Sequence, residues 1–449
     1  MALSPLTRSV ASAAAAVVLA GLLSALPTPT VAATAAHTAH ARAHHQARHH
    51  AVRVPRSFFG LHDGSGQAYQ HLDFGSLRLW DAGVTWSQVE TSQGVFNWSR
   101  LDSLVSAAQA HHVQVTLVLG MTPSFYADAP TLAPRSLNAF TRYVSAVMNR
   151  YRSFHGQRGI AAYQVWNEGN ISHFWTGTPQ QLAQLTGIVE RTRDSVDPGA
   201  TVVAPSFAVR LPYQRAWMRQ YQRQRVDGHP VWKAYDVNAL SLYPKARYGE
   251  RAGGPESAMR LLGRVRHQMD RIGVPRSKKI WATEINYGVT GGGLADGAAT
   301  PISERRQVAN VLRTYLLGAS RGLTRVFWYR YDWGRTPTGG TLGNTLLSDP
   351  GDYSRVSAAG LALRTAERWL SGRLLARQGK RPCARDRRGT YHCVVRYNGV
   401  VRSIYWNPHR QVRVQIPRHA STRLLGRAVA RHSTRTVRVG YQPMVVRAR

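Results

Sequence analysis

Eight strand-like segments alternate with helical segments between Ser57 and Ser371, and this alternation constrains the fold more than any other feature of the chain. Each strand-like segment is a short apolar run, whereas the helical segments place apolar residues three and four positions apart. Eight such units over about 310 residues predict an α/β fold, a closed (β/α)8 TIM barrel. The predicted strands are Ser57–Asp63, Leu77–Trp80, Gln114–Gly120, Ile160–Asn167, Thr201–Phe207, Val237–Tyr243, Lys279–Glu284 and Thr324–Tyr331.

An open, doubly wound sheet is the alternative fold, and it is disfavoured because no glycine-rich phosphate turn follows the first strand. The clearest helical pattern is Ser303–Ser320, where Ser303 is a candidate N-cap before an amphipathic run. The other predicted helices are Trp98–His112, Leu137–Arg152, Pro179–Val196 and Ser357–Ser371.

The two ends of the chain differ from the barrel region. Residues 1–33 have a basic start, a short apolar run and small residues at the end, which predicts a signal peptide and a secreted, extracellular protein. An uncleaved N-terminal anchor is the alternative, although no later segment is apolar enough to span a membrane. Residues 34–55 are rich in His and Ala and are predicted to be a disordered linker. The barrel would then cover residues 56–371, and a small C-terminal all-β domain residues 372–449.

The only two cysteines, Cys383 and Cys393, lie in this last region on either side of Gly389. In an exported protein such a pair is expected to close a hairpin as a disulfide. A zinc site is disfavoured because a second pair of cysteines is missing.

The net charge is +36, and it is unevenly distributed. Residues 372–449 contain 19 Lys and Arg against one acid, Asp386, and therefore carry +18. Such a field favours an anionic partner: acidic polysaccharide, a cell-wall polymer, anionic lipid or nucleic acid. Nucleic acid is the least favoured, because no recognition motif is present. A solvated basic surface without a partner is an equally acceptable explanation.

Two predicted strands end in a glutamate, Glu168 after Trp166-Asn167 and Glu284 after Ala282-Thr283. In a (β/α)8 barrel these side chains would meet at one mouth. Retaining cleavage of a glycosidic bond needs one carboxylic acid and one carboxylate, about 5–5.5 Å apart. The alternative is a pair of structural, salt-bridged glutamates. Because metal-site and nucleotide-site spacings are missing, no metal or cofactor is expected.

These residues also resemble a known family. Trp166-Asn167-Glu168, followed by Asn170 and by Phe174-Trp175, looks like the acid/base motif of glycoside hydrolase clan A, and most like family 39. That family contains β-xylosidases and α-L-iduronidases. Ala282-Thr283-Glu284 resembles its nucleophile strand, and the likeness covers Ser57 to Ser371.

The resemblance implies that Glu168 is the acid/base and Glu284 the nucleophile. It assigns Asn167 to the 2-hydroxyl of the sugar, Arg78 and Tyr243 to the nucleophile, and Trp328 to a platform under the sugar ring. His62 and Asp63, at the end of the first strand, are further candidates for substrate binding.

Gly169 departs from the family, which usually has proline there, and we expect the glycine to loosen the loop after Glu168. The resulting prediction is a retaining glycosidase that hydrolyses O-glycosyl bonds of a carbohydrate substrate, a β-xylosidase or another β-glycosidase. The alternative is a catalytically silent protein that binds carbohydrate or cell wall through the barrel and the basic tail.

Overall fold

The computed structural model describes residues 50–244, 253–288, 302–332, 345–349, 352–370, 373–376, 381–397 and 400–447. The predicted signal peptide, residues 1–33, lies outside the described residues, as does most of the predicted linker. Residues from Ala47 to the end form one compact unit, so the boundary at residues 371 and 372 stays a prediction. In the described ranges no helix combines the length and the apolar character that a membrane span needs.

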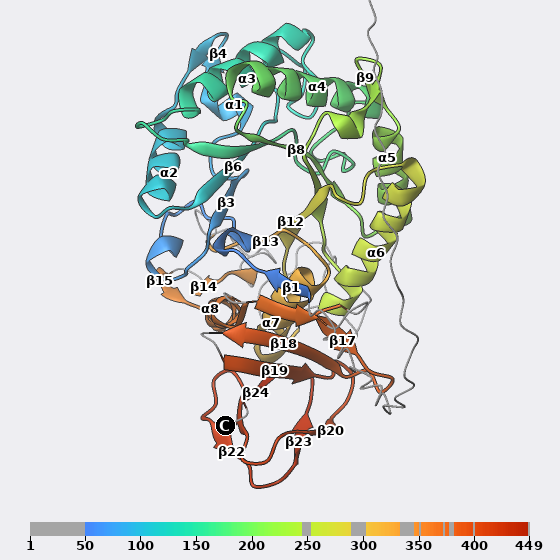
Figure 1. Ribbon diagram of the computed structural model, residues 1–449. Helices are drawn as coiled ribbons and strands as arrows, with labels where there is room; N and C mark the ends of the chain where they lie inside the picture. Colours follow the sequence, from blue (N-terminus) through green and yellow to red (C-terminus); the bar gives the residue numbers. More distant parts are fainter. Residues whose placement is uncertain are drawn as a thin grey trace, which may run out of the picture. The chain divides into compact units, whose positions relative to one another are not determined.

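A closed barrel of eight parallel strands forms the first part of the fold (Figure 1). Every strand pairs in parallel with its neighbours, and β13 closes the ring onto β2. The prediction of a (β/α)8 barrel is therefore confirmed. The strands are β2 (Phe59–Leu61), β3 (Ser76–Leu79), β6 (Gln114–Val118), β7 (Ile160–Gln164), β8 (Thr201–Ala208), β11 (Val237–Ser241), β12 (Lys279–Ile285) and β13 (Arg325–Trp328).

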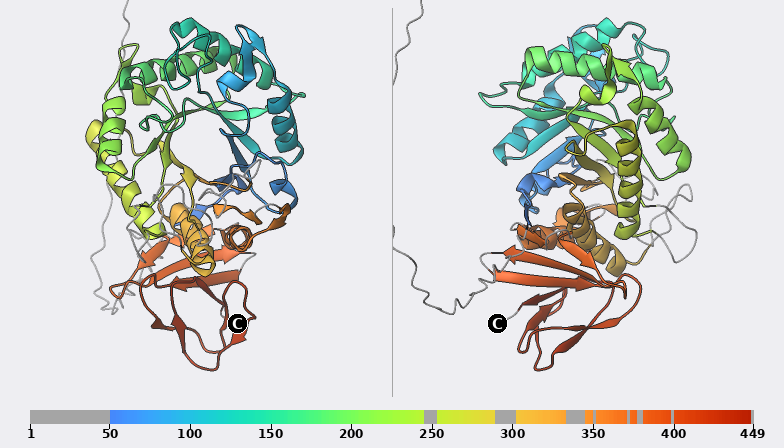
Figure 2. Two further views of the ribbon diagram at one scale, coloured as in Figure 1. Left: turned by 180° about the vertical axis from the view of Figure 1, so that it is seen from behind. Right: turned by 45° about the vertical axis from the view of Figure 1, so that its right-hand side comes forward.

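Helices surround the barrel on the outside (Figure 2). At α7 the hydroxyl of Ser303 accepts a hydrogen bond from the backbone N–H of Arg306, so the predicted N-cap is confirmed. Thr178 caps α4 in the same way, with proline at the first helical position. The helices are α1 (Trp86–Val89), α2 (Ser99–Ala110), α3 (Leu137–Tyr151), α4 (Pro179–Val196), α5 (Pro212–Gln222), α6 (Pro255–Ile272), α7 (Glu304–Ser320) and α8 (Ala358–Leu370).

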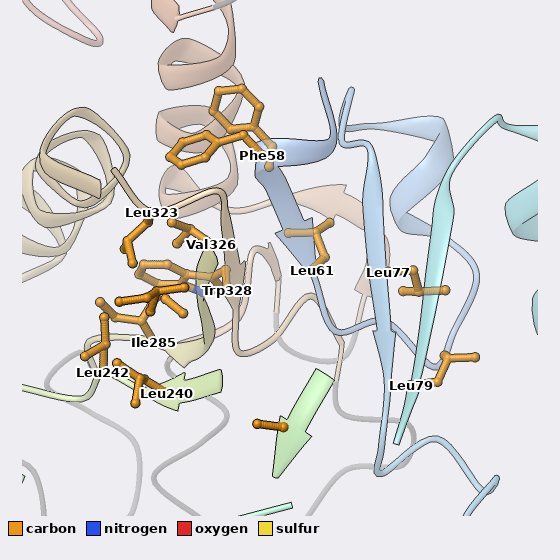
Figure 3. Packing of buried hydrophobic residues seen from close by; sticks show 14 of the residues in the cluster. Phe58, Leu61, Leu77, Leu79, Leu240, Leu242, Ile285, Leu323, Val326 and Trp328 are labelled. Carbon is orange, nitrogen blue, oxygen red and sulfur yellow. The ribbon is translucent and has the colours of Figure 1, made fainter. Parts of the chain in front are cut away.

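Side chains of the barrel strands alternate between two cores. Leu61, Leu77 and Val326 belong to the large cluster that also contains residues of the surrounding helices (Figure 3). Phe327 belongs to a separate cluster of strand residues inside the barrel. A Cβ atom on Gly60 would lie 2.5 Å from the Phe327 ring, so only glycine lets that ring fill the interior. This alternation decides which strand residues reach the barrel mouth.

The C-terminal region forms an antiparallel sheet, as predicted. Its strands are β1 (His50–Arg53), β16 (Arg373–Ala376), β17 (Cys383–Arg385), β18 (Tyr391–Tyr397), β19 (Val400–Trp406), β21 (Ser421–Arg423), β22 (Ala430–Arg431) and β24 (Met444–Arg447). β20 (Val412–Gln415) and β23 (Thr436–Val439) pair separately. The disulfide between Cys383 and Cys393 joins β17 to β18 and confirms the predicted pair.

Strand β1 corrects the predicted linker, which extended to residue 55. His50–Arg53 pairs antiparallel with β16 and adds a strand to the edge of the sheet. The unpaired N–H and C=O groups of an edge strand bind any extended backbone, whatever its side-chain pattern. A sequence without apolar periodicity therefore gave no sign of this pairing.

A buried ion pair between two helices of the barrel also binds a residue of the sheet. Glu256 of α6 accepts hydrogen bonds from Arg313 of α7 at 2.9 Å and from the indole N–H of Trp406, in β19, at 3.0 Å. Burial raises the pKa of the Glu256 carboxyl, but Arg313 and Trp406 outweigh burial and hold it below its ordinary value. The charge of Glu256 therefore stabilises the contact between the two parts of the fold.

We expect Glu256→Gln to lower the free energy of unfolding by roughly 3–5 kcal/mol, because it leaves the buried charge of Arg313 without a counter-ion. Unfolding in urea at pH 7 measures the effect. The matched control is Asp128→Asn, which removes the acid of an exposed pair with Arg135 and should cost less than about 1 kcal/mol. Equal losses for the two variants would contradict this role of Glu256.

Candidate active site

Arg78 of β3 is the centre of a polar cluster at the carboxyl ends of the barrel strands. It lies between the outward-facing Leu77 and Leu79, so the alternation of the strand directs it into the barrel, where it is 1% exposed. Its Nε donates to Gln164 at 2.8 Å, and one Nη donates to Asn167 at 2.8 Å. Its other Nη donates to Glu284 at 2.9 Å. Arg78 thus connects β3 with β7, the loop after β7, and β12.

Glu284 lies near the end of β12 and is 5% exposed. Its carboxylate accepts the hydrogen bond from Arg78 and a second one, at 2.9 Å, from the hydroxyl of Tyr243. Burial raises the pKa of Glu284, and both donors oppose that rise by stabilising the charged form. Burial prevails, so the pKa of Glu284 stays above its ordinary value, while Arg78 and Tyr243 are the groups that favour the ionised carboxylate.

Glu168 lies in a different environment, and its side chain is partly exposed. Burial of the carboxyl, followed by the negative charge of Glu284, raises the pKa of Glu168 to about 8. Glu168 therefore keeps its proton at pH 7, while hydrogen bonds to Glu284 favour the charged form there. The pKa of each carboxyl is raised, but at Glu284 the hydrogen bonds from Arg78 and Tyr243 oppose the rise. An acid and a nucleophile at one site need such a difference in environment.

The backbone at Glu168 is held in an uncommon conformation. Its φ is 38°, in the left-handed region that residues with a side chain seldom adopt. Two hydrogen bonds to Ser206 of β8 hold it: the N–H of Glu168 donates to the hydroxyl at 2.8 Å, and that of Gly169 to the carbonyl at 3.0 Å. The neighbouring strand therefore fixes the direction in which the Glu168 side chain leaves the backbone.

Gly169 does not loosen the loop, and that expectation was wrong. Its N–H is committed to Ser206, a bond that proline could not make. A Cβ atom at this position would also lie 2.5 Å from Leu182. Asn170 tightens the loop further, because its side-chain amide donates to the carbonyls of Ala208 and Gln214 at 2.7 and 2.9 Å.

The amide of Asn167 is oriented by two donors. Its oxygen accepts from Arg78 at 2.8 Å and from the Ser206 hydroxyl at 3.2 Å. The amide oxygen is therefore engaged by these two donors, and the amide nitrogen remains as a donor for a further hydrogen bond. Asn167 and Glu284 are held by the same guanidinium, which fixes their spacing.

The structure places His62 inside the barrel rather than on an open surface. It is 1% exposed, and its Nε2 lies 2.9 Å from the carbonyl of Thr283 and 3.5 Å from Arg78. Burial, and then the charge of Arg78, lowers its pKa to about 3, so the ring is neutral at pH 7. His62 thus supports the backbone beside Glu284.

Asp63 is not available for substrate in this structure, which corrects its prediction as a substrate-binding residue. Its carboxylate is 2% exposed and accepts hydrogen bonds from the backbone N–H groups of Ser65, Gly66 and Ala68 and from the Ser65 hydroxyl. A side chain that satisfies its own turn in this way is a structural cap.

Trp328 is also corrected. It is fully buried on the helix side of the barrel beside Val326 and Ile285, and its indole N–H donates to the carbonyl of Thr345 at 2.7 Å (Figure 3). Because strand side chains alternate, the next residue, Tyr329, points to the mouth instead. Its ring lies 4.9 Å from that of His62, and its hydroxyl donates to Asp81.

Sequence reasoning missed several residues that hold the site together. Gln164 and Ser206 anchor Arg78, Asn167 and the backbone of Glu168. The only signal for Gln164 was a polar residue two positions before Trp166 in an apolar strand. Asp81, which accepts from Tyr329 and from Arg330 at 2.8 Å, gave no signal, because its partners come from β13 and the segment after it.

Comparison with known proteins supports the barrel. No family model matches the chain. A β-xylosidase from Geobacillus stearothermophilus is 23% identical over 124 residues, a match that covers 25% of each chain. The chain thus spans about a quarter of the length of this curated relative.

Solved structures resemble a larger part of the chain. A glucosidase from Croceicoccus marinus is 12% identical, with a TM-score of 0.60. The match covers 88% of this chain and 96% of the glucosidase. A family 51 arabinofuranosidase from Xanthomonas axonopodis pv. citri has a TM-score of 0.55 at 11% identity, with coverage of 88% and 97%. A family 30 endoxylanase from Clostridium papyrosolvens C71 has a TM-score of 0.53 at 14% identity, with coverage of 88% and 96%.

These similarities concern the fold. The matched part, 88% of the chain, is longer than the barrel region. The structural similarity therefore includes part of the C-terminal sheet. The resemblance to the barrel glycosidases of clan A is confirmed at this level.

Proposed function

We propose that the protein is an exported glycoside hydrolase that cleaves O-glycosidic bonds with retention of configuration, through a covalent glycosyl-enzyme. One observation carries the proposal. Glu168, with a pKa raised to about 8, and Glu284, bonded to Arg78 and Tyr243, share one barrel mouth in different environments. This pair of environments is what an acid and a nucleophile need at the same pH.

In the first step Glu284 attacks the anomeric carbon, and a glycosyl ester forms as the bond to the leaving oxygen breaks. Glu168 donates its proton to that oxygen. Arg78 and Tyr243 hold the attacking carboxylate in a single orientation, so little reorganisation is needed during the attack.

In the second step Glu168, now ionised, takes a proton from water, and the water oxygen attacks the anomeric carbon. Glu284 leaves as the free carboxylate, and Glu168 regains its proton. The amide nitrogen of Asn167 donates to the 2-hydroxyl of the sugar, because its oxygen is held by Arg78 and Ser206. Tyr329, partly exposed at the mouth, provides an aromatic surface for the sugar ring.

We assign the substrate to the β-linked glycosides of a polysaccharide or oligosaccharide, with β-xylosides as the first candidates. The Trp166-Asn167-Glu168 motif supports this choice, together with the short match to a β-xylosidase. Export is supported by the composition of residues 1–33 and by the disulfide of Cys383 and Cys393, a bond that persists in oxidising compartments.

The test is a panel of aryl β-glycosides, followed by trapping with the 2-deoxy-2-fluoro analogue of the sugar that is turned over. The fluorine slows both steps, so a good leaving group allows the glycosyl-enzyme to accumulate. We expect one glycosyl group per protein, located by peptide mass spectrometry on Glu284.

Unchanged substrate across the whole panel would argue against glycosidase activity and favour a binding protein without catalysis. Product of inverted configuration, observed by NMR at early times, would overturn the double displacement. A label on Glu168 instead of Glu284 would exchange the two roles.

A further inference from the structure

A groove lies between the barrel and the C-terminal sheet, away from the residues that surround Arg78. It has a volume of about 350 Å³. One wall is the last turn of α8, with Arg368 and Trp369, and the other is formed by β21, the loop that follows it, and the end of β24. The groove therefore combines residues of two parts of the fold that sequence reasoning treated separately.

The groove is basic on both sides. Arg368 of α8, Arg423 of β21 and Arg447 of β24 line it, and all three are exposed. Among the described residues that form its walls, none is acidic. Guanidinium groups on opposite walls make a site for carboxylate or sulfate groups, which they bind through paired hydrogen bonds.

The groove is also apolar in part. Trp369 is partly buried and lines it together with Leu425 and Val429, and Val429 is 53% exposed. An indole ring beside an aliphatic surface suits the apolar face of a sugar ring. Small inorganic anions use the arginines alone, whereas a uronate residue would use both kinds of contact.

A second basic groove, of about 490 Å³, borders the same loop. Leu424 lines both grooves. The second is lined by Arg305 and Arg306 of α7 and by Arg427 and Arg438 of the C-terminal region, again with no acid among the described lining residues. Two basic grooves that share one loop offer charge complementarity to an extended polyanion rather than to a single ion.

We propose that the groove between α8 and the loop after β21 is a binding site for acidic polysaccharide, with a uronate ring against Trp369 and its carboxylate between Arg368, Arg423 and Arg447. The polymer continues over the loop into the second basic groove. This site retains the protein on an acidic polymer, and it does not depend on the proposed glycosidase activity.

Binding of the full chain to polygalacturonate, measured by isothermal titration calorimetry, tests the proposal. Fully methyl-esterified polygalacturonate is the neutral counterpart of the same polymer. We expect Arg423→Gln/Arg447→Gln to weaken binding about tenfold or more, because each substitution removes hydrogen bonds from a guanidinium to the uronate carboxylate. The matched control is Arg413→Gln/Arg431→Gln, which removes the same charge from exposed residues outside the groove and should change affinity less than about threefold.

A second variant, Trp369→Ala, leaves the net charge of the protein unchanged. If this variant unfolds, Trp369→Phe is tested in its place. Either should weaken polygalacturonate binding while retaining wild-type turnover of an aryl glycoside. Equal losses for the two arginine pairs would overturn the site and leave only general attraction by the basic surface. Equal affinity for the methyl-esterified polymer, or tighter binding of duplex DNA through the same residues, would also overturn it.

Discussion

Replacing Glu284 by glutamine is expected to lower kcat/KM for an aryl glycoside by on the order of 10⁴-fold or more, because the amide cannot form the glycosyl ester. The variant should remain folded but melt at a lower temperature, because the buried charge of Arg78 loses its counter-ion. The amide oxygen of glutamine can still accept the hydrogen bond of Arg78, which also keeps its bonds to Asn167 and Gln164. Steady-state kinetics and a thermal melt give the two readouts.

The control for this variant is Glu304→Gln, which removes an exposed carboxylate at the start of α7. It should retain wild-type kinetics. If Glu284→Gln turned over substrate at the rate of this control, Glu284 would not be the nucleophile, and the proposed mechanism would fail with it.

Replacing Glu168 by glutamine is expected to lower kcat/KM by about 10²–10⁴-fold for substrates with poor leaving groups, the range typical of general acid catalysis. Substrates with an activated phenol need little protonation, so their first step should be almost unchanged, and a burst of phenol should precede a slow second step. Azide attacks without help from a base and should restore turnover. Azide should not rescue Glu284→Gln, which never forms the intermediate.

The pH profile gives the acid role a separate readout. Because the pKa of Glu168 is raised to about 8, the proton is present at pH 7 and is lost as the pH rises through that value. For poor leaving groups, kcat/KM should therefore fall above about pH 8, with an apparent pKa that belongs to the coupled pair. Glu168→Gln should lose this alkaline limb. A wild-type profile that stays flat to pH 10 would contradict the assignment of the acid.

The positions of the barrel strands followed from the sequence because the pattern of each strand is local. Short apolar runs separated by amphipathic helices have one compact solution, and the ends of parallel strands share one edge. Asn167, Glu168 and Glu284 were found in this way, whereas Arg78 and Tyr243 came from the family resemblance. In the structure, hydrogen bonds join Asn167 to Arg78, Arg78 to Glu284, and Glu284 to Tyr243. No comparable pattern indicated Gln164 or Ser206, which anchor them from neighbouring strands.

Most of the errors came from contacts between residues that are far apart in the chain. In the last strand Phe327 points into the barrel. Because neighbouring side chains of a strand point to opposite faces, Trp328 then faces the helices and Tyr329 faces the mouth. Asp63 is used by its own turn, and Gly169 is held by Ser206 and by contact with Leu182. The outcomes at Trp328 and Gly169 depend on partners that only folding brings close, whereas Asp63 bonds to residues a few positions along the chain.

The sequence by itself thus determined the (β/α)8 barrel and the strand-end residues Asn167, Glu168 and Glu284, because periodicity and strand-end position are written in consecutive residues. The disulfide followed from the single pair of cysteines, and Arg78 and Tyr243 from the family resemblance. The tertiary structure decided how the two glutamates differ in their protonation, because burial and a neighbouring charge set the pKa of Glu168. It also decided that strand β1 joins the C-terminal sheet and that α8 and this sheet form a basic groove. Those properties arise between residues far apart in the chain, and only their packing creates them.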